Sequence, residues 1–235
     1  MNCRIVVVSC PSRAPLQQIW KACFIDGWQD CPFPVTILSP TPDVGWNANL
    51  IACLETLSET YVLLMLDDNL IEPSTEYTAN IRAVLELMSD RPDIGLIKLQ
   101  AGGAHAPEIP FPSWPRIREY DRRPHPFKRT NLVPAMYRRE WLLRFSKAVL
   151  ADCGSERDVG RGGALEFEST GTKLTADPTH WPERMFGIHR PDPGGSGGHS
   201  LLVCYANDAV TGGKVREMEP LRSFCKGVIG IEAFL

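Results

Sequence analysis

Short apolar runs alternate with helical stripes along the first hundred positions of the chain. The runs, rich in β-branched and aliphatic side chains, are residues 4–9, 35–38, 61–66 and 94–99. Between them, apolar residues recur at helical spacing in residues 16–24, 46–57 and 81–88. Short apolar runs are typical of buried strands, and their alternation with helices favours a parallel sheet. The pattern predicts an α/β fold in a single domain, with a mostly parallel central sheet flanked by helices.

This alternation stops at residues 101–129. Six prolines lie there: Pro107, Pro110, Pro112, Pro115, Pro124 and Pro126. Because proline lacks a backbone donor, we expect neither regular helix nor central strand in this segment. Beyond it, the pattern predicts strands over 132–137, 185–189 and 201–205, and helices from Trp141 and over 164–174. Earlier in the chain, Pro73 suits the first turn of the helix that contains residues 81–88.

The composition is that of a globular chain. The sequence has 235 residues, of which 43% are hydrophobic and 23% charged, and this excludes a disordered, collagen-like or coiled-coil protein. The longest strongly apolar run, 61–66, is well below the roughly 20 residues of a membrane span. The N-terminal apolar stretch is too short for a signal peptide. Without a secretory signal, we expect a cytoplasmic protein with reduced thiols. None of its eight cysteines forms a C-x-x-C pair, which argues against a zinc knuckle.

A basic segment is concealed by the overall net charge of −3. Residues 116–147 carry ten Lys or Arg and three Asp or Glu, a net charge of +7. Aromatic residues lie among or beside them: Trp114, Tyr120, Phe127, Tyr137 and Trp141. Arginine with aromatic residues suits phosphate contact and base stacking. The ordinary alternative is a solvated face, with ion pairs to Glu119, Asp121 and Glu140.

The most informative site is Asp67-Asp68-Asn69, directly after the run 61–66. Two adjacent carboxylates at the end of a buried strand are costly unless they are paired or bind a cation. In open α/β sheets, the ligand crevice lies outside the carboxyl ends of the strands. Mg²⁺ or Mn²⁺ prefers such oxygen ligands and can bridge a diphosphate. The alternative is a simple turn, because Asp and Asn are favoured there.

The chain resembles glycosyltransferases of the GT-A fold, and family 2 in particular. The resemblance is carried by residues 45–49, by the strand 61–66 that runs into Asp67-Asp68, and by residues 9–13 after the first strand. It implies a Rossmann-like domain, with a nucleotide-sugar-binding half at 1–100 and an acceptor-binding and catalytic half at 101–235. It also implies that the donor nucleotide, for example UDP, contacts Ser9, Pro11, Arg13, Asn49 and Asp67.

The same resemblance implies a metal site. Asp68 would bind Mn²⁺ or Mg²⁺, and Asp67 would contact the ribose or the metal. Which role falls on which aspartate is left open by the sequence. His189 is in the right zone for a late histidine ligand, with His199 as the alternative. Neither the P-loop pattern nor G-x-G-x-x-G occurs, which counts against a P-loop kinase or an NAD enzyme.

Sugar transfer with inversion needs a general base near the acceptor hydroxyl. Inverting relatives place an acidic residue at a helix start, and Glu166 and Glu168 match that place. At helical spacing the two point to different faces, so we expect one of them, preferably Glu166, to face the cleft. The alternative is that both are solvated surface residues. A retaining enzyme would not need such a base.

The sequence therefore predicts a metal-dependent glycosyltransferase, of hexosyltransferase type, that moves a sugar from a nucleotide-diphosphate sugar to a hydroxyl. Arg122, Arg123, Lys128 and Arg129 are the predicted acceptor contacts. A hydroxymethylated base in DNA, as modified by some phage enzymes, would fit and would have to flip out of the duplex. Another anionic acceptor fits equally. The alternatives are a nucleotidyltransferase, disfavoured because residues 9–13 lack glycine, and a non-catalytic nucleic-acid-binding module.

Overall fold

The computed structural model defines most of the chain as helices and strands. It describes residues 2–9, 14–39, 43–101, 109–111, 114–120, 130, 132–159, 162–188, 200–202, 204, 210–211 and 214–215. The helices are α1 (Ala14–Gly27), α2 (Trp46–Thr56), α3 (Tyr77–Asp90), α4 (Arg139–Asp158) and α5 (Gly162–Leu174). The strands are β1 (Cys3–Val8), β2 (Val35–Leu38), β3 (Tyr61–Leu66), β4 (Ile94–Ala101), β5 (Ile109–Phe111), β6 (Trp114–Glu119), β7 (Ala135–Arg138), β8 (Arg184–Ile188), β9 (Val210–Thr211) and β10 (Lys214–Val215).

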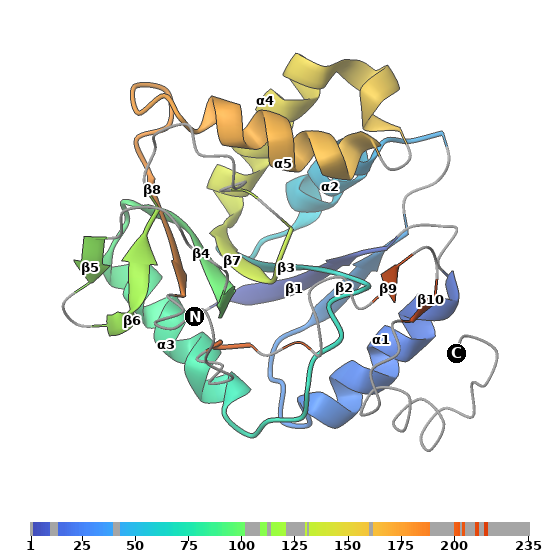
Figure 1. Ribbon diagram of the computed structural model, residues 1–235, viewed down its shortest axis with the longest axis vertical. Coiled ribbons are helices and arrows are strands. Elements are labelled where there is room, and N and C mark those ends of the chain that lie inside the picture. Colours follow the sequence, from blue (N-terminus) through green and yellow to red (C-terminus); the bar gives the residue numbers. More distant parts are fainter. Residues whose placement is uncertain are drawn as a thin grey trace.

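One eight-stranded sheet forms the centre of the molecule, in the order β2-β1-β3-β7-β4-β8-β6-β5. Helices α1 and α3 cover one face, and α2, α4 and α5 cover the other (Figure 1). This confirms the predicted α/β fold with a helix-flanked central sheet.

The sheet is mixed, although most of its strands point the same way. Strands β2, β1 and β3 are parallel neighbours, as are β4 and β8. Strand β7 lies antiparallel between β3 and β4, and β6 lies antiparallel between β8 and β5. The carboxyl ends of β1, β3, β4 and β8 therefore meet at one edge of the sheet, where β7 begins.

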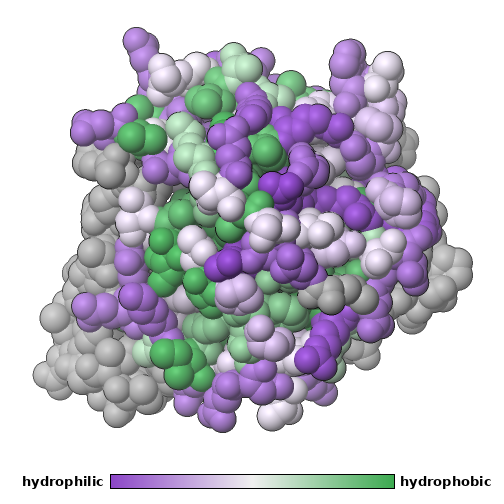
Figure 2. All heavy atoms as spheres, turned by 180° about the vertical axis from the view of Figure 1, so that it is seen from behind, coloured by the Kyte–Doolittle hydropathy of each residue, from purple (hydrophilic) through white to green (hydrophobic). Residues whose placement is uncertain are grey.

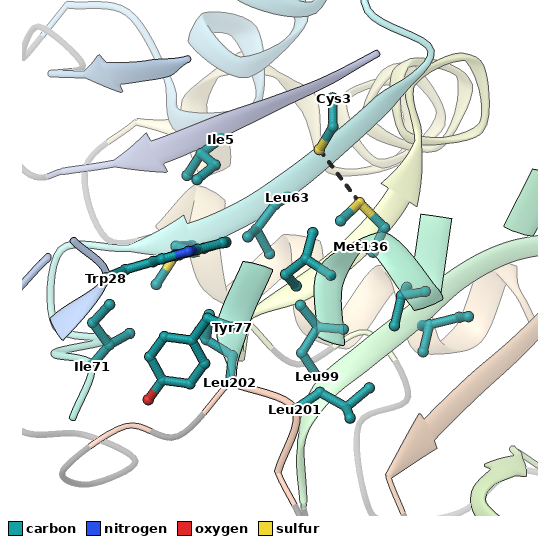
Figure 3. Close-up of a cluster of buried hydrophobic side chains, with 14 of the residues drawn as sticks. Cys3, Ile5, Trp28, Leu63, Ile71, Tyr77, Leu99, Met136, Leu201 and Leu202 are labelled. Atoms are coloured by element: carbon teal, nitrogen blue, oxygen red, sulfur yellow. Dashed lines mark hydrogen bonds between the residues drawn. The ribbon is translucent and has the colours of Figure 1, made fainter. Parts of the chain in front are cut away.

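The first core lies between the sheet and the pair α1 and α3. Figure 3 shows Ile5, Leu63 and Leu99 from three strands, directed toward Trp28 and Tyr77 beneath the sheet. The rings of Trp28 and Tyr77 meet edge to face at 5.7 Å, a favoured geometry for aromatic pairs. These buried contacts pack β1 and β3 against α1.

The second core, on the opposite face, is built on stacked aromatic rings. Trp141 and Phe145 of α4 stack at 4.9 Å, and Phe167 of α5 meets Phe145 edge to face at 4.8 Å. Trp46, the first residue of α2, contacts Phe167 at 5.1 Å. The aromatic cluster thus joins three helices to the sheet.

Most predicted elements are confirmed within a few residues, but three expectations are wrong. Helix α3 begins at Tyr77 and not near Pro73, because residues 70–76 run against α1, with the Ser74 amide bonded to the Gly27 carbonyl at 3.0 Å. The proline-rich segment does contain strands, β5 and β6. Pro115 is tolerated in β6 because it falls where the pairing with β5 shifts register.

The predicted strand at 201–205 is the third error. Leu201 and Leu202 form a bend, and both amides donate to the Leu99 carbonyl, at 2.8 and 3.3 Å. Cys204 makes an isolated antiparallel bridge with Ile71. This segment is therefore anchored to two different parts of the chain and not to one neighbouring strand.

The surface is mostly hydrophilic. From behind, hydrophobic atoms show mainly in the middle of the face, between hydrophilic side chains (Figure 2). Among the described residues the exposed large hydrophobic side chains are Ile25, Val35, Val44, Val159 and Leu165.

No helix in the described part of the chain has the length and apolarity needed to cross a membrane. Six cysteines lie in that part, and five of them are buried.

Two neighbouring positions on α5 test the second core. Phe167 is fully buried, whereas Leu165 is 55% exposed. We expect Phe167→Ala to lower the free energy of unfolding by about 3–5 kcal/mol, because it leaves a cavity between Trp46 and Phe145. Leu165→Ala, the matched control, should change it by no more than about 0.5 kcal/mol. Urea denaturation measures both, and equal effects would contradict the described packing.

A partly buried ion pair joins the start of β1 to the residues before β3. Nε and Nη2 of Arg4 donate to Oε1 of Glu59 at 2.9 and 2.6 Å. Burial by itself would raise the pKa of Glu59, but the hydrogen bonds from Arg4 and nearby backbone amides hold it below its ordinary value of 4.5. The ionised carboxylate therefore stabilises the folded state.

This pair predicts a pH dependence of stability. Its contribution is complete above about pH 4.5 and is lost as the pH falls through the lowered folded pKa. We expect Glu59→Gln to lower the unfolding free energy at neutral pH by about 1–3 kcal/mol and to flatten its decline toward acid. Glu55→Gln, in an exposed pair with Lys147, is the control. The same pH profile in Glu59→Gln and wild type, measured by urea denaturation, would contradict this.

Candidate functional site

The sheet reverses its winding direction between β1 and β3. From β1 the chain passes through α1 to β2 on one side, then through α2 to β3 on the other. Helices α1 and α2 lie on opposite faces, so the topological switch point lies outside the carboxyl ends of β1 and β3. Open α/β sheets bind their ligands at such a switch point. Ser9 follows β1 there, and Asp67 follows β3.

A hydrogen bond between side chains joins these two strand ends. Ser9 Oγ donates to Asp67 Oδ2 at 2.7 Å, and Gln17 of α1 donates to Ser9 Oγ at 2.9 Å. The Gln17 amide also donates to Ser39 Oγ at 2.7 Å, after β2. Ser9 therefore holds one carboxylate oxygen of Asp67, Gln17 holds Ser9, and Gln17 is held in turn by Ser39. Gln17 was not predicted, since its place one turn into a helix carries no recognisable motif.

Asp67 and Asp68 are the central residues of a tight turn from Leu66 to Asn69, directly after β3. The side-chain oxygen of Asn69 accepts a hydrogen bond from the Leu66 backbone N–H at 2.8 Å. In the other direction, the Asn69 backbone N–H donates to the Leu66 carbonyl at 3.1 Å. The turn chemistry is thus present, yet the carboxylates do not face open water. Asp67 is 3% exposed and Asp68 is 8% exposed. A turn can form with its acidic side chains in water, so the turn by itself does not explain why two adjacent acids are buried.

The C-terminal segment reaches this turn from the far end of the sequence. Cys204 pairs with Ile71, three residues after Asp68. Burial raises the pKa of the Cys204 thiol, and the nearby charges of Asp68 and Glu72 raise it further. Cys204 is therefore a neutral, buried neighbour of the acidic turn and not a reactive thiolate.

The acidic turn fits a hard divalent cation with few protein ligands. Mg²⁺ is commonly held by one or two carboxylates, with substrate phosphates and waters completing the octahedron. Asp67 and Asp68 can supply those carboxylates from adjacent positions. In the described part of the chain, no group of three His, Cys, Asp or Glu side chains forms a complete metal site. A cation here would depend on the phosphates of a bound nucleotide.

Helix α2 also begins at the carboxyl edge, but its N-terminus is already occupied by a carboxylate. Asp158 Oδ1 accepts from the Asn47 backbone N–H at 2.8 Å and its side chain at 2.7 Å, and Oδ2 accepts from the Ala48 N–H at 3.0 Å. Gly45 and Gly163 leave room for it, since a Cβ on either would collide with Asp158. This helix end is therefore not open to a phosphate. The contact spans more than a hundred residues and was not predicted.

The predicted nucleotide contact Asn49 lies in the first turn of α2. Its side-chain amide donates to the carbonyls of Val44 and Gly45, at 3.0 and 2.9 Å. The structure thus shows Asn49 supporting the loop before α2.

The two candidate bases point to different partners, as expected. Glu166 accepts from Thr170 Oγ1 at 2.9 Å and lies 3.6 Å from Arg157. Glu168 Oε1 accepts from the Leu132 backbone N–H at 2.8 Å. Because β7 runs antiparallel to β3, Leu132 precedes β7 at the carboxyl edge of the sheet. Glu168 is thus bonded to the backbone before β7 at the edge that carries Asp67, and Glu166 pairs with Arg157, next to the Asp158 that caps α2 at the same edge.

The basic segment is in part structural. Arg138 donates to the carbonyls of Ile94 and Arg91, at 2.8 Å each, and Arg144 pairs with Glu183. The suggested base-stacking role of Tyr137 and Trp141 is wrong, because both rings are buried in the second core. The remaining predicted contacts lie outside the described residues: Pro11, Arg13, Arg122, Arg123, Lys128, Arg129, His189 and the alternative His199.

Cavities lined by described residues occur at the opposite edge of the sheet. One, of about 440 Å³, is lined by residues that include Cys3, Pro34 and Arg82. Another, of about 270 Å³, is lined by residues that include Thr60 and Arg138. These positions are at the amino ends of β1, β2 and β3 and at the end of the antiparallel β7. Neither cavity belongs to the candidate site.

Comparison with known proteins gives only distant similarities. No protein-family model matches the chain, and no curated protein matches it. Among solved structures, CMP:2-keto-3-deoxy-manno-octonic acid synthetase complexed with CTP aligns with a TM-score of 0.42 and 10% identity, over 81% of this chain and 90% of that one. 4-Diphosphocytidyl-2C-methyl-D-erythritol synthase from Anaerococcus prevotii aligns at 0.41 and 9%, over 80% and 88%.

S. aureus TarS in complex with UDP aligns with a TM-score of 0.44 and 11% identity. The match covers 80% of this chain but 58% of that TarS chain. Similarities of this size establish neither a family nor an activity.

The cap on α2 is open to a direct test. We expect Asp158→Ala to lower the free energy of unfolding by about 2–4 kcal/mol, because it removes a charged cap and leaves the N–H groups of Asn47 and Ala48 without their acceptor. Asp152→Ala, at an exposed position of the same helix, should change it by no more than about 0.5 kcal/mol. Chemical denaturation compares them, and a small loss for Asp158→Ala would contradict the capping role.

Proposed function

We propose that this chain is a metal-dependent glycosyltransferase that takes a sugar from a nucleotide-diphosphate sugar, with UDP as the nucleotide to test first. The observation that carries the proposal is the buried pair Asp67 and Asp68, joined to Ser9 at the switch point of the sheet. An α/β sheet presents its ligand crevice at this place, and carboxylate oxygens there are ligands that a hard divalent cation prefers.

Each residue of the site would have a distinct task. Ser9 and Gln17 fix Asp67, so that its carboxylate keeps one orientation toward a ribose hydroxyl or a shared cation. Asp68 would be a direct metal ligand. A bound Mn²⁺ or Mg²⁺ would neutralise charge on the departing nucleotide diphosphate. The N-terminus of α2 is already capped by Asp158, so it offers no alternative site for the phosphates. This supports phosphate binding through a cation at Asp68.

For an inverting transfer, Glu168 is the better candidate for the general base. Its hydrogen bond to Leu132 holds it at the edge of the sheet where the nucleotide would bind. Glu166, the alternative base, accepts from Thr170 and pairs with Arg157, which precedes the α2 cap Asp158. The acceptor hydroxyl would then lie between Glu168 and the acidic turn. Whether it belongs to DNA or to another anionic molecule is tested by adding each to the transfer reaction.

Calorimetric titration with UDP tests the nucleotide site. Wild type should bind UDP in the presence of Mn²⁺ and much more weakly in its absence. Asp68→Asn keeps the size of the side chain and removes its charge. We expect its Mn²⁺-dependent affinity to fall about 100-fold, which corresponds to about 3 kcal/mol for a lost charged contact.

The matched control is Asp152→Asn, an exposed acid on α4, which should bind UDP as wild type does. Unfolding curves of both variants establish that the fold is intact. Equal, metal-independent binding by wild type and Asp68→Asn would overturn the proposal. Release of pyrophosphate from a nucleoside triphosphate, without hydrolysis of nucleotide sugars, would favour the nucleotidyltransferase alternative instead.

A further inference from the structure

The side chain of Gln17 makes two hydrogen bonds from a single nitrogen atom. Its Nε2 donates to Ser9 Oγ at 2.9 Å and to Ser39 Oγ at 2.7 Å. The two serines follow neighbouring parallel strands, Ser9 after β1 and Ser39 after β2. A primary amide nitrogen has two hydrogens, so both side-chain donors of Gln17 are used at the carboxyl edge of the sheet.

Ser9 accepts this hydrogen bond and donates the next one. A hydroxyl group has one hydrogen to donate. Because Gln17 donates to Ser9 Oγ, the Ser9 hydrogen is available for Asp67 Oδ2, which lies 2.7 Å away. Asp67 is 3% exposed, so water is a poor substitute for that donor. The hydrogen bonds therefore run in one direction, from α1 through the end of β1 to the end of β3.

The opposite orientation of the Gln17 amide would leave this edge short of a hydrogen. The amide oxygen would then face Ser9 Oγ, and the Asp67 carboxylate would face the same hydroxyl. Two acceptors would compete for one hydrogen, and the loser would meet an oxygen with no hydrogen between them. Loss of a donor costs a buried acceptor more than an ordinary hydrogen bond contributes. The direction of the Ser9 hydroxyl thus depends on residue 17 being a donor.

We propose that Gln17 is a positioning residue that acts on Asp67 through Ser9. By donating to Ser9, Gln17 makes Ser9 a donor toward Asp67, and this holds the carboxylate in one orientation. The role requires an amide, because an ionised glutamate of nearly the same size can accept but not donate. The effect on nucleotide binding rests on the proposed function, whereas the direction of the hydrogen bonds does not.

Urea denaturation of the ligand-free chain tests the direction. Gln17→Glu makes residue 17 an acceptor, and we expect the equilibrium constant for unfolding to rise about tenfold. The matched control, Gln18→Glu, places the same charge on the next, exposed residue of α1 and should change that constant by no more than about twofold. In an Asp67→Asn background the effect of Gln17→Glu should disappear, because the introduced amide can donate to Ser9 and the hydrogen bonds reverse.

Repulsion between the introduced carboxylate and Asp67 would give the same pattern, and Ser9→Ala separates the two causes. Without the Ser9 hydroxyl there is no shared hydrogen, so Asp67→Asn should no longer relieve the effect of Gln17→Glu. The proposal is refuted if that relief persists in Ser9→Ala. It is refuted equally if Gln17→Glu and Gln18→Glu destabilise the chain to the same extent.

Calorimetric titration with UDP and Mn²⁺ tests the link to the proposed function. We expect Gln17→Glu to weaken binding about tenfold, whereas Gln18→Glu should bind as wild type does. Gln17→Glu combined with Asp67→Asn should recover stability but not binding, because the carboxylate is gone. Equal affinities of Gln17→Glu and Gln18→Glu would contradict the positioning role. Failure of wild type to bind UDP would overturn the proposed function, and the unfolding experiment would still decide the direction of the hydrogen bonds.

Discussion

The hydrogen bond from Ser9 to Asp67 joins the two strands between which the sheet reverses its winding. It places a buried carboxylate at the one position of an α/β sheet where neighbouring loops diverge and a ligand can enter. The adjacent Asp68 is buried as well, so two carboxyl groups lie next to each other in a poorly solvated volume. The proposed metal-dependent chemistry starts from this arrangement, because carboxylates are ligands that a hard divalent cation prefers.

The rest of the fold keeps that edge in place. The first core holds β1 and β3 against Trp28 and Tyr77, and the second core joins α2, α4 and α5 through stacked rings. Long-range polar contacts complete the edge: Asp158 caps α2, and Glu168 binds the backbone before β7. Because these contacts come from both halves of the sequence, the two halves form one domain around a common site.

Sequence patterns predicted helices and strands well where buried apolar residues recur at a regular spacing. Strands β2 and β3 have the predicted bounds, and the site at Asp67-Asp68 was visible because an apolar run ends in acids. Prediction failed where tertiary contacts override local signals. Pro73 lies in an extended segment held by Gly27, Pro115 is tolerated at a register shift, and Tyr137 and Trp141 serve the core instead of a nucleic acid. The Gly27 carbonyl that holds the segment after Pro73 lies more than forty residues away in the sequence.

By itself, the sequence determined the alternation of strands and helices and the position of the acidic turn, because periodicity and strand-end chemistry are local properties. The tertiary structure alone decided that Ser9 and Gln17 fix Asp67, that Asp158 closes the end of α2, and that Lys98 and Gln100 lie buried in β4. Such pairings depend on sheet order and strand register, which bring together residues up to a hundred or more positions apart, and no periodicity records them.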